Sequence, residues 1–463
     1  MSSAVETVAE LGAIQELQNL FGDRIVTSRS ACREFGSDES FHGNYPPDAV
    51  FAPRSTQEVV EVVEICARHK FPVIPYGTGT SLEGHVCALH GGICLNMIEM
   101  NEVLKVNAED LDVVVQPGVT RKQLNHELKD SGLFFPIDPG ADASLGGMTA
   151  TRASGTNAVR YGTMRENVLS LTVVMADGEI IKTARRSRKS AAGYDLTHLM
   201  VGSEGTLGII TEITLRVYGI PEKISSAVVA FPELRSAVDA VILTIQLGIP
   251  IARIELLDDS MMEALNRYSK MDYPEEHTLF LEFHGSENSV REQVEMVQMI
   301  CEEHGGGHFN WTVHTEERNR LWQARHDAAY AAKAMRPNAQ IWATDVCVPI
   351  SRLAQCITET KEDIVNSGLL APIVGHVGDG NFHLVLLVDH TNPEEEARAQ
   401  ALHETMVMRA LEMDGTCTGE HGIGYGKLDF LVAEHGAAVS VMRTIKKSLD
   451  PDNILNPGKI VRV

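Results

Sequence analysis

The stretch of sequence that decides the fold runs from Phe71 to Ser81 and reads Phe-Pro-Val-Ile-Pro-Tyr-Gly-Thr-Gly-Thr-Ser. Its first six residues predict a buried strand, and its last five predict a loop whose backbone N–H groups and hydroxyls suit a pyrophosphate. A helix is predicted over residues 56–69, and strands over 91–96 and 113–117. Because a helix precedes the loop and a strand follows it, this is not the glycine turn of a dinucleotide-binding βαβ unit. By itself, such a loop is more often a plain turn between strands.

Two further segments, residues 139–157 and 201–208, consist almost entirely of small side chains. Close packing of helices through small residues is one explanation of such a run. Glycines and hydroxyls gathered in this number favour instead the approach of a ligand to the backbone. These two segments and the loop after Tyr76 make three small-residue segments, which together predict the lining of one elongated cofactor.

Length and composition indicate an ordinary globular protein of two large or three smaller domains, since 44% of its 463 residues are hydrophobic and 22% are charged. The net charge of −23 argues against nucleic acid as a partner. No apolar run approaches the roughly 18 residues of a membrane span, so no transmembrane segment is expected. A short basic cluster without interleaved aromatic residues predicts only a solvated loop; it comprises Arg185, Arg186, Arg188 and Lys189.

Cysteine usage and the N-terminal composition bear on the compartment. The eight cysteines include no C-x-x-C pair, which argues against an iron–sulfur cluster or a zinc knuckle and favours reduced, mostly buried thiols. The N-terminus carries Glu6, Glu10 and Glu16 rather than an Arg-rich transit pattern, so a cytoplasmic location is expected. The alternative is a mitochondrial location, if a presequence was removed.

The pattern changes after the strand predicted over residues 207–217, where Tyr218-Gly-Ile-Pro221 indicates a turn and a domain boundary. Beyond it, a strand over residues 278–283 and helices over 289–303 and 316–335 predict a second domain, a sheet with helices packed on one face. A last helix is predicted over residues 440–449.

The strongest metal signal is Gly375-His-Val-Gly-Asp-Gly-Asn-Phe-His383, which has apolar, strand-like flanks. Asp379-Gly380 is a preferred hairpin turn, and a two-residue turn there would pair residue 376 directly with residue 383. Side chains of cross-strand partners lie about 5 Å apart at Cβ, so His376 and His383 could bind one cation. The alternative is a surface hairpin with two solvated histidines.

A second glycine-rich segment, Gly415-Thr-Cys-Thr-Gly-Glu-His-Gly-Ile-Gly424, supplies another acid and another histidine. Glu420 would complete a two-histidine, one-carboxylate set, while the flanking glycines let His421 turn toward a substrate. A metal with an open position would polarise a hydroxyl or carbonyl oxygen, and a neutral histidine beside it suits a base near pH 7. A flexible loop with unrelated polar residues is the alternative.

Taken together, these segments resemble the FAD-linked oxidoreductases of the vanillyl-alcohol oxidase superfamily, and within it the branch of cytochrome-type D-lactate dehydrogenases and glycolate oxidase flavin subunits. The likeness covers nearly the whole chain. It rests on six motifs in this order: Pro75-Tyr-Gly-Thr-Gly-Thr-Ser81, Asp138-Pro-Gly-Ala-Asp-Ala-Ser144, Ala153-Ser-Gly-Thr-Asn-Ala-Val-Arg-Tyr-Gly-Thr163, Gly202-Ser-Glu-Gly-Thr-Leu-Gly208, Gly375-His-Val-Gly-Asp-Gly-Asn-Phe-His383 and Gly419-Glu-His-Gly-Ile-Gly424.

The resemblance implies an α+β architecture with a two-lobed FAD-binding domain of the vanillyl-alcohol oxidase (PCMH) type and an α+β cap domain with a largely antiparallel sheet. Residues 1–45 would form an N-terminal helical lead-in, and residues 46–221 the FAD-binding domain, completed by residues 422–463. Residues 222–421 would form the cap domain that covers the isoalloxazine and carries the metal site.

The same resemblance implies that His376, His383 and Glu420 bind one divalent ion, Zn²⁺ or Mn²⁺. His421 becomes the base and Arg325 the clamp for a substrate carboxylate. Spacing alone gives Arg325 little support, because most arginines on such helices face solvent.

FAD is implied to be bound without a covalent link, because Thr80 stands where some members carry the histidine that attaches the flavin. Arg152 departs from some relatives, which have glycine there, and no added iron–sulfur domain is present in this sequence. The residues implied to contact FAD are Pro75, Gly77, Thr78, Gly79, Thr80, Ser81, Pro139, Asp142, Ser144, Gly146, Gly147, Thr151, Ser154, Gly155, Asn157, Tyr161, Glu204, Gly205, Gly208, Ile209, Ile210 and Asn456.

The implied reaction is the oxidation of a small D-2-hydroxy acid, D-lactate to pyruvate, with hydride transfer to flavin. Electrons would pass to an external acceptor, either cytochrome c, an electron-transfer flavoprotein or a quinone. Glycolate and D-2-hydroxyglutarate are the rival substrates. Two other classes stay open: a flavin subunit that works only inside a multi-chain oxidase, and a non-redox transferase on the same fold.

Overall fold

The computed structural model describes residues 2–463, with side chains from residue 12 onward, so Glu6 and Glu10 lie outside the described side chains. The chain divides into two compact units. The first unit comprises the chain up to Ser154, Thr163–Gly219 and Glu420–Val463, and the second comprises Gly155–Gly162 and Ile220–Gly419. The segment Gly155–Gly162 thus groups with the second unit although it falls inside the range 46–221 expected for the FAD-binding domain.

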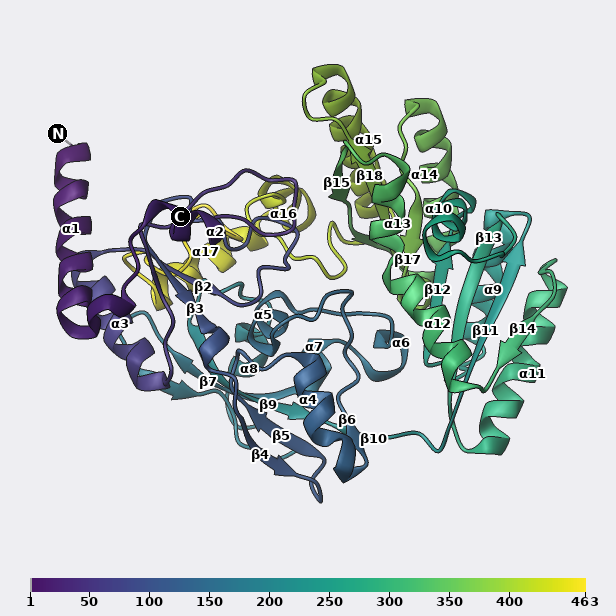
Figure 1. Ribbon diagram of the computed structural model, residues 1–463, viewed down its shortest axis with the longest axis horizontal. Helices are drawn as coiled ribbons and strands as arrows, with labels where there is room; N and C mark the ends of the chain where they lie inside the picture. Colours follow the sequence, from purple (N-terminus) through teal and green to yellow (C-terminus); the bar gives the residue numbers. More distant parts are fainter. Residues whose placement is uncertain (1) are drawn as a thin grey trace. The chain divides into compact units, whose positions relative to one another are not determined.

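A small parallel sheet of the first unit has the order β1-β3-β2, formed by β1 (Ala49–Phe51), β3 (Ile93–Asn96) and β2 (Val73–Tyr76). Figure 1 labels its strands β2 and β3. Helix α3 (Thr56–His69) has the predicted bounds, because the Ser55 side chain caps its first turn and Lys70 ends it in the left-handed conformation. The buried valines of α3 share one core with these strands and with Leu17 of α1 (Ser2–Phe21).

The second sheet of the first unit is antiparallel and has the order β4-β5-β9-β7-β8. Its core also includes apolar side chains of α4 (Arg121–Leu128) and α5 (Leu145–Thr151). The strands are β4 (Val103–Asn107), β5 (Asp112–Val115), β9 (Ile209–Arg216), β7 (Val168–Val174) and β8 (Ile180–Lys182).

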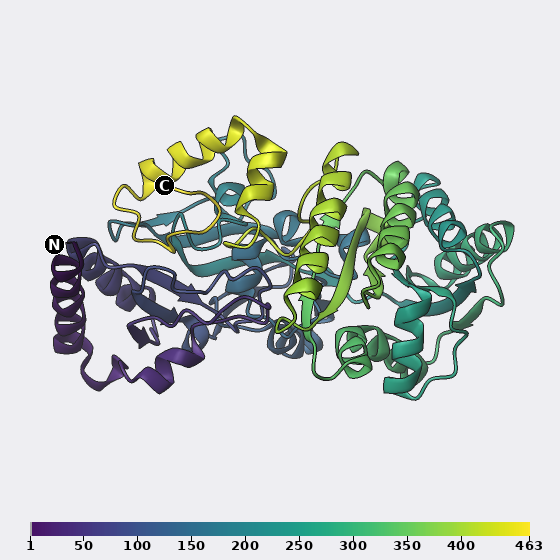
Figure 2. The same cartoon turned by 90° about the horizontal axis from the view of Figure 1, so that it is seen from above.

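The end of the chain completes the first unit (yellow in Figure 2). It carries α16 (Leu428–His435) and α17 (Ala438–Leu449). Leu455 forms a parallel bridge with Val73 of β2, and the buried Lys446 Nζ of α17 donates to the Thr206 carbonyl at 2.8 Å.

The second unit is built on an antiparallel sheet of order β14-β11-β13-β12-β17-β18-β15, with β16 pairing to β18. Residues 278–284 of β13 and all residues of β18 are buried. Because successive side chains of a strand point to opposite faces, both faces of the sheet are covered. The expectation of helices on one face is therefore wrong. The strands are β11 (Lys223–Phe231), β12 (Arg253–Leu257), β13 (His277–Gly285), β14 (Asn310–Thr312), β15 (Gln340–Ala343), β16 (Val346–Cys347), β17 (Ile373–Gly375) and β18 (Asn381–Val388).

The helices of the second unit include α12 (Thr315–His326) and α13 (Ala328–Met335), which replace the single helix predicted over residues 316–335. The break falls at Asp327, a residue type with low helix propensity whose side chain accepts from Gln323 Nε2 at 3.0 Å. α10, α12 and α13 share one core cluster with β11, β12, β13, β17 and β18. The other helices are α9 (Leu234–Gln246), α10 (Asp259–Ser269), α11 (Glu287–Glu303), α14 (Leu353–Ser367), α15 (Pro393–Glu412) and the short α6 (Ala158–Tyr161).

The remaining elements of the first unit are short. They are α2 (Arg29–Glu34), β6 (Leu133–Phe134), β10 (Tyr218–Gly219), α7 (Met164–Asn167) and α8 (Leu196–Met200). All eight cysteines lie in the described part of the chain as free thiols, and seven are buried, as expected. Among the described residues no helix is both long and apolar enough to cross a membrane.

Candidate active site

His376 and His383 lie on either side of the connection between β17 and β18. The strands pair with Val374 opposite His383, and the connection contains a 3-10 helix, η5 (Val377–Asp379). The predicted two-residue turn at Asp379-Gly380 is therefore wrong, and the pairing is shifted by two residues. Gly380 ends η5 with φ +80°, and a Cβ there would lie 2.1 Å from the Val348 carbonyl oxygen, so the glycine fits a longer connection.

The two imidazoles nevertheless meet, with ring centroids 5.5 Å apart and ring planes at 81°. His376 follows Gly375, the last residue of β17, so its side chain lies beyond the paired part of the strands. A Cβ on Gly375 would lie 2.8 Å from the Cβ of Phe382. Because glycine has no Cβ, β17 and β18 can approach closely at this point.

Glu420 supplies a third donor, since one ligand atom each of His376, His383 and Glu420 lies within 4.8 Å of the others. Glu420 is the first residue after Gly419, where the second unit ends, so chain connectivity holds it beside that unit's last segment. That segment is anchored by two backbone hydrogen bonds between Thr416 and Cys347. Two imidazoles and a carboxylate suit zinc or manganese and leave a coordination position open, so the donor set fits the implied ion.

A buried carboxylate that sequence reasoning missed orients His376. Glu255 of β12 is 1% exposed, and its Oε1 lies 2.7 Å from His376 Nδ1. With its hydrogen on Nδ1, the imidazole presents the lone pair of Nε2 to an ion. Burial raises the pKa of Glu255, but the charges and hydrogen bonds of His376 and Arg325 outweigh burial and hold that pKa below its ordinary value.

His383 is oriented in a similar way. Its Nδ1 lies 3.0 Å from the Thr344 carbonyl oxygen and 3.5 Å from a carboxylate oxygen of the fully buried Asp345. Thr418 Oγ1 donates to the other Asp345 oxygen at 2.6 Å. Sequence reasoning missed Asp345 as well.

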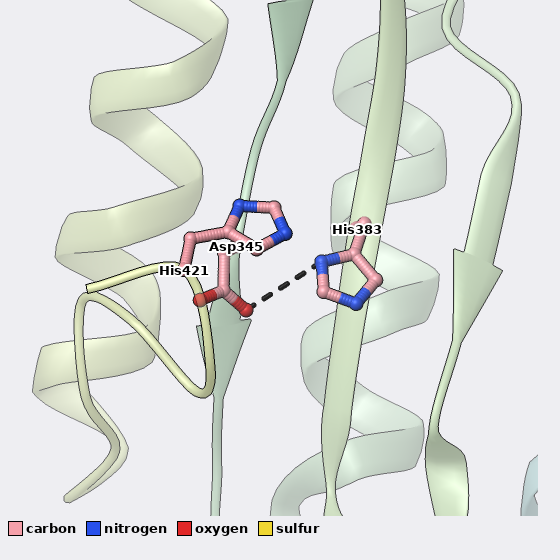
Figure 3. Close-up of side chains that lie close together, drawn as sticks. All are labelled: Asp345, His383 and His421. Atoms are coloured by element: carbon pink, nitrogen blue, oxygen red, sulfur yellow. Dashed lines mark ion pairs between the residues drawn. The ribbon is translucent and has the colours of Figure 1, made fainter. Parts of the chain in front are cut away.

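His421 lies beside this acid. One ligand atom each of Asp345, His383 and His421 lies within 4.8 Å of the others, and Figure 3 shows the three side chains gathered around the Asp345 carboxylate. The dashed line in Figure 3 joins Asp345 to His383. Asp345 is thus placed to interact with an imidazolium at residue 421.

Arg325 does not face solvent, since only 8% of it is exposed. Its Nε and Nη2 both donate to Glu255 Oε2, at 3.0 and 2.5 Å. The guanidinium therefore belongs to the same hydrogen-bonded group as His376, and its role as a carboxylate clamp stays a prediction.

The small-residue segments predicted to line a cofactor come together in the first unit, apart from residues 155–157 of the second segment. A Cβ on Gly77 would lie 2.2 Å from Ser144 Oγ, and a Cβ on Gly205 would lie 2.4 Å from the Pro75 ring. Ser144 Oγ is buried and has no hydrogen-bond partner among the described residues. Glycines at points of close approach and an unsatisfied hydroxyl fit the backbone contacts that a dinucleotide needs, so these residues fit FAD.

Several predicted cofactor contacts instead have partners within the protein. Both Glu204 oxygens accept backbone N–H groups, from Ile423 at 2.7 Å and from Gly424 at 2.8 Å. The Asn456 amide donates to the carbonyls of His85 and Glu204, at 3.0 and 2.8 Å. These two side chains tie the C-terminal segment to the rest of the first unit, and their contact with FAD stays a prediction.

Gly155, Asn157 and Tyr161 lie in the second unit, where Asn157 Oδ1 accepts from Arg253 Nε at 3.0 Å and Tyr161 Oη lies 2.8 Å from His284 Nδ1. Arg152 ends α5 with φ +57°, a conformation that favours glycine, and its Nη2 donates to the Val201 carbonyl at 3.1 Å. This contact explains how an arginine is held where some relatives have glycine.

The fold is that of the PCMH-type flavoenzymes, which confirms the predicted architecture. A solved structure of p-cresol methylhydroxylase with substrate bound matches with a TM-score of 0.81, at 19% sequence identity, over 97% of this chain and 96% of that one.

Sequence comparison then identifies the family. Residues 47–184 match the family described as "FAD binding domain", and residues 220–460 match "FAD linked oxidases, C-terminal domain". The chain belongs to the FAD-linked oxidase family and is an FAD-dependent oxidoreductase, as the motifs predicted.

Two relatives are similar over almost the entire chain. The probable D-lactate dehydrogenase, mitochondrial, of Danio rerio is 54% identical over 99% of this chain and 94% of its own length. The D-lactate dehydrogenase [cytochrome], mitochondrial, of Arabidopsis thaliana is 46% identical over 97% of this chain and 80% of its own length.

Proposed function

We propose that this protein is an FAD-dependent D-lactate dehydrogenase that oxidises D-lactate to pyruvate with the help of a divalent ion and passes the electrons to a cytochrome. The names of its relatives support the substrate, the acceptor and a mitochondrial location, the alternative to the cytoplasmic expectation. The observation that carries the proposal is the approach of His376, His383 and Glu420 to within 4.8 Å of one another in a chain of this family.

His376 and His383, through their Nε2 atoms, and the Glu420 carboxylate would hold the ion. A zinc or manganese ion in this position supplies a Lewis acid that polarises the hydroxyl and carboxylate oxygens of a 2-hydroxy acid. Glu255 and the Thr344 carbonyl fix the orientation of the two imidazoles, so the protein presents two ready donors.

His421 removes the hydroxyl proton of the substrate. The nearby Asp345 carboxylate stabilises the imidazolium that results, because opposite charges favour the protonated form of histidine. Arg325 pairs with the substrate carboxylate through N–H groups of its guanidinium, which fixes the direction of the bound acid.

The small-residue segments from Gly77, Pro139 and Val201 hold FAD without a covalent bond. Bound FAD supplies the acceptor for the hydride that leaves the substrate C2. Glu204 and Asn456 keep the C-terminal segment against these loops through the hydrogen bonds described above.

The test is an anaerobic reduction screen of the purified holoenzyme over D-lactate, L-lactate, glycolate and D-2-hydroxyglutarate, with and without chelator. We expect D-lactate to bleach the flavin fastest, with release of pyruvate and a strong loss of rate after chelation. A flavin that stays yellow with all four acids would instead indicate a subunit that depends on partner chains. Bleaching unaffected by thorough removal of metal would contradict the role of the ion.

A further inference from the structure

Glu255 lies between two groups that the proposed function uses. Its Oε1 lies 2.7 Å from His376 Nδ1, and its Oε2 accepts from Arg325 Nε at 3.0 Å. The carboxylate is 1% exposed and occupies β12, whereas Arg325 comes from α12 and His376 from the end of β17. One buried carboxylate thus joins a metal-binding histidine to the arginine expected to bind substrate.

A second group of the same composition joins Arg253 of β12 to Glu282 and His284 of the adjacent strand β13. Glu282 is 4% exposed, its Oε1 lies 2.9 Å from His284 Nε2, and Arg253 Nε lies 3.4 Å from the same oxygen. Arg253 also stacks over the Trp322 ring, with 4.5 Å from its Cζ to the ring centroid. His284 is not part of the metal-binding set, so this second cluster offers an internal comparison within one sheet.

We propose that Glu255 is a positioning residue with two effects: it fixes the ring of His376 so that Nε2 faces the ion, and it limits how strongly Arg325 attracts the substrate carboxylate. The inference rests on the proposed function, because that function assigns His376 and Arg325.

The first effect follows from hydrogen bonding. An imidazole whose Nδ1–H is held by a carboxylate keeps one tautomer and one orientation, and its Nε2 becomes a stronger donor to a cation. Loss of such a partner lowers metal affinity by about 10–100-fold in other sites.

The second effect follows from charge. Arg325 carries one positive charge, and Glu255 already takes two of its N–H groups at short distance. A substrate carboxylate is therefore a second anion on the same guanidinium. With an uncharged side chain at residue 255, Arg325 should bind a carboxylate more tightly, by about 10-fold for one charge-assisted hydrogen bond.

The experiment compares Glu255→Gln with wild type and with Glu282→Gln, which removes the same charge from the second cluster. Mn²⁺ affinity of the FAD-loaded protein is measured by calorimetry. Pyruvate affinity is measured on the metal-free, FAD-loaded protein by fluorescence titration. We expect Glu255→Gln to bind Mn²⁺ about 10–100-fold more weakly, and to bind pyruvate more tightly. Glu282→Gln should leave both affinities close to those of wild type.

Opposite changes in the two affinities would support the proposal, because general damage to the fold would weaken both. Equal Mn²⁺ affinities of Glu255→Gln and Glu282→Gln, or a joint loss of both affinities in Glu255→Gln, would overturn it. Should Glu255→Gln fail to fold, Glu255→Asp serves instead, because it keeps the charge and withdraws it by one methylene. That variant should lose Mn²⁺ affinity without gaining pyruvate affinity, and unchanged Mn²⁺ binding would overturn the proposal. A wild-type protein that takes up no Mn²⁺ or Zn²⁺ would overturn the proposed metal centre, and this inference with it.

Discussion

At the scale of single residues, a hydrogen bond fixes the ring orientation of each of the two histidines proposed to bind the metal. His376 is held by Glu255 and His383 by the Thr344 carbonyl, each through Nδ1. The role of His421 is different, since it lies near Asp345 and is expected to exchange a proton with substrate.

Replacement of His421 with Ala should slow flavin reduction by about 10²–10⁴-fold, because the substrate hydroxyl then loses its base. FAD content and metal content should stay at wild-type levels, since neither is assigned to this imidazole. Stopped-flow absorbance under anaerobic D-lactate measures the rate, and the exposed His435→Ala serves as a control. Reduction at close to the wild-type rate would remove His421 as the base.

The ion pair of Glu282 predicts a pH dependence of stability. Burial raises the pKa of this carboxyl, but Arg253, His284 and Ser226 outweigh burial and lower the pKa from 4.5 to about 2. A carboxyl with a depressed pKa in the folded state stabilises fully above its unfolded value and loses that contribution as the pH falls toward the folded value. The free energy of unfolding of wild type should therefore approach that of Glu282→Gln between pH 4.5 and about 2. Urea denaturation of both proteins across that range measures the difference, and a constant difference would contradict the assigned shift.

The sequence predicted the proposed metal ligands but not Glu255 and Asp345, the buried acids next to their imidazoles. Residues 376, 383, 420 and 421 stand in glycine-rich motifs that are visible within short segments. Glu255 lies 121 positions before His376, inside an apolar strand, and becomes its neighbour only when β12 pairs with β17. Local spacing carries no information on such a contact, although a lone carboxylate in an apolar strand is itself a signal that it has a buried partner.

At the scale of elements, most helices and strands of the expected types formed within a few residues of their predicted bounds. The hairpin of the metal site differed, because Asp379-Gly380 was interpreted as a complete two-residue turn. The glycine instead ends η5, and the sequence Asp-Gly satisfies both arrangements. The imidazoles of His376 and His383 lie close together in both arrangements. The prediction that they share a ligand site therefore did not depend on the exact strand register.

Gly380→Ala tests the longer connection. The residue has φ +80°, and the new Cβ would lie 2.1 Å from the Val348 carbonyl oxygen. We expect a loss of roughly 1–3 kcal/mol in the free energy of unfolding, together with weaker metal binding, because the histidines flank η5. Gly368→Ala is the matched control, with φ +67° and a nearest atom 3.6 Å away. Thermal denaturation and Mn²⁺ titration measure the two effects, and equal behaviour of the two variants would contradict this account.

At the scale of the whole molecule, the first unit includes the segment Glu420–Val463, which is distant in sequence from the residues it contacts. Asn456→Ala should lower FAD retention, because it leaves the buried carbonyls of His85 and Glu204 without their donor, at a cost of about 1–3 kcal/mol. The ratio of flavin to protein absorbance after gel filtration measures retention, and the exposed Asn101→Ala provides the control. Full retention by Asn456→Ala would show that the C-terminal segment does not support the cofactor loops.

The discontinuous first unit sets an order of events on the ribosome. Residues 220–419 and the earlier segment 155–162 have all been made before Glu420 is added, so the second unit can close while translation continues. The bridge between Leu455 and Val73, at one edge of the parallel sheet, can form only after residue 455 has been added. Until Leu455 has been added, the edge of β2 that faces away from β3 lacks this bridge, and an unpaired strand edge can pair with other chains.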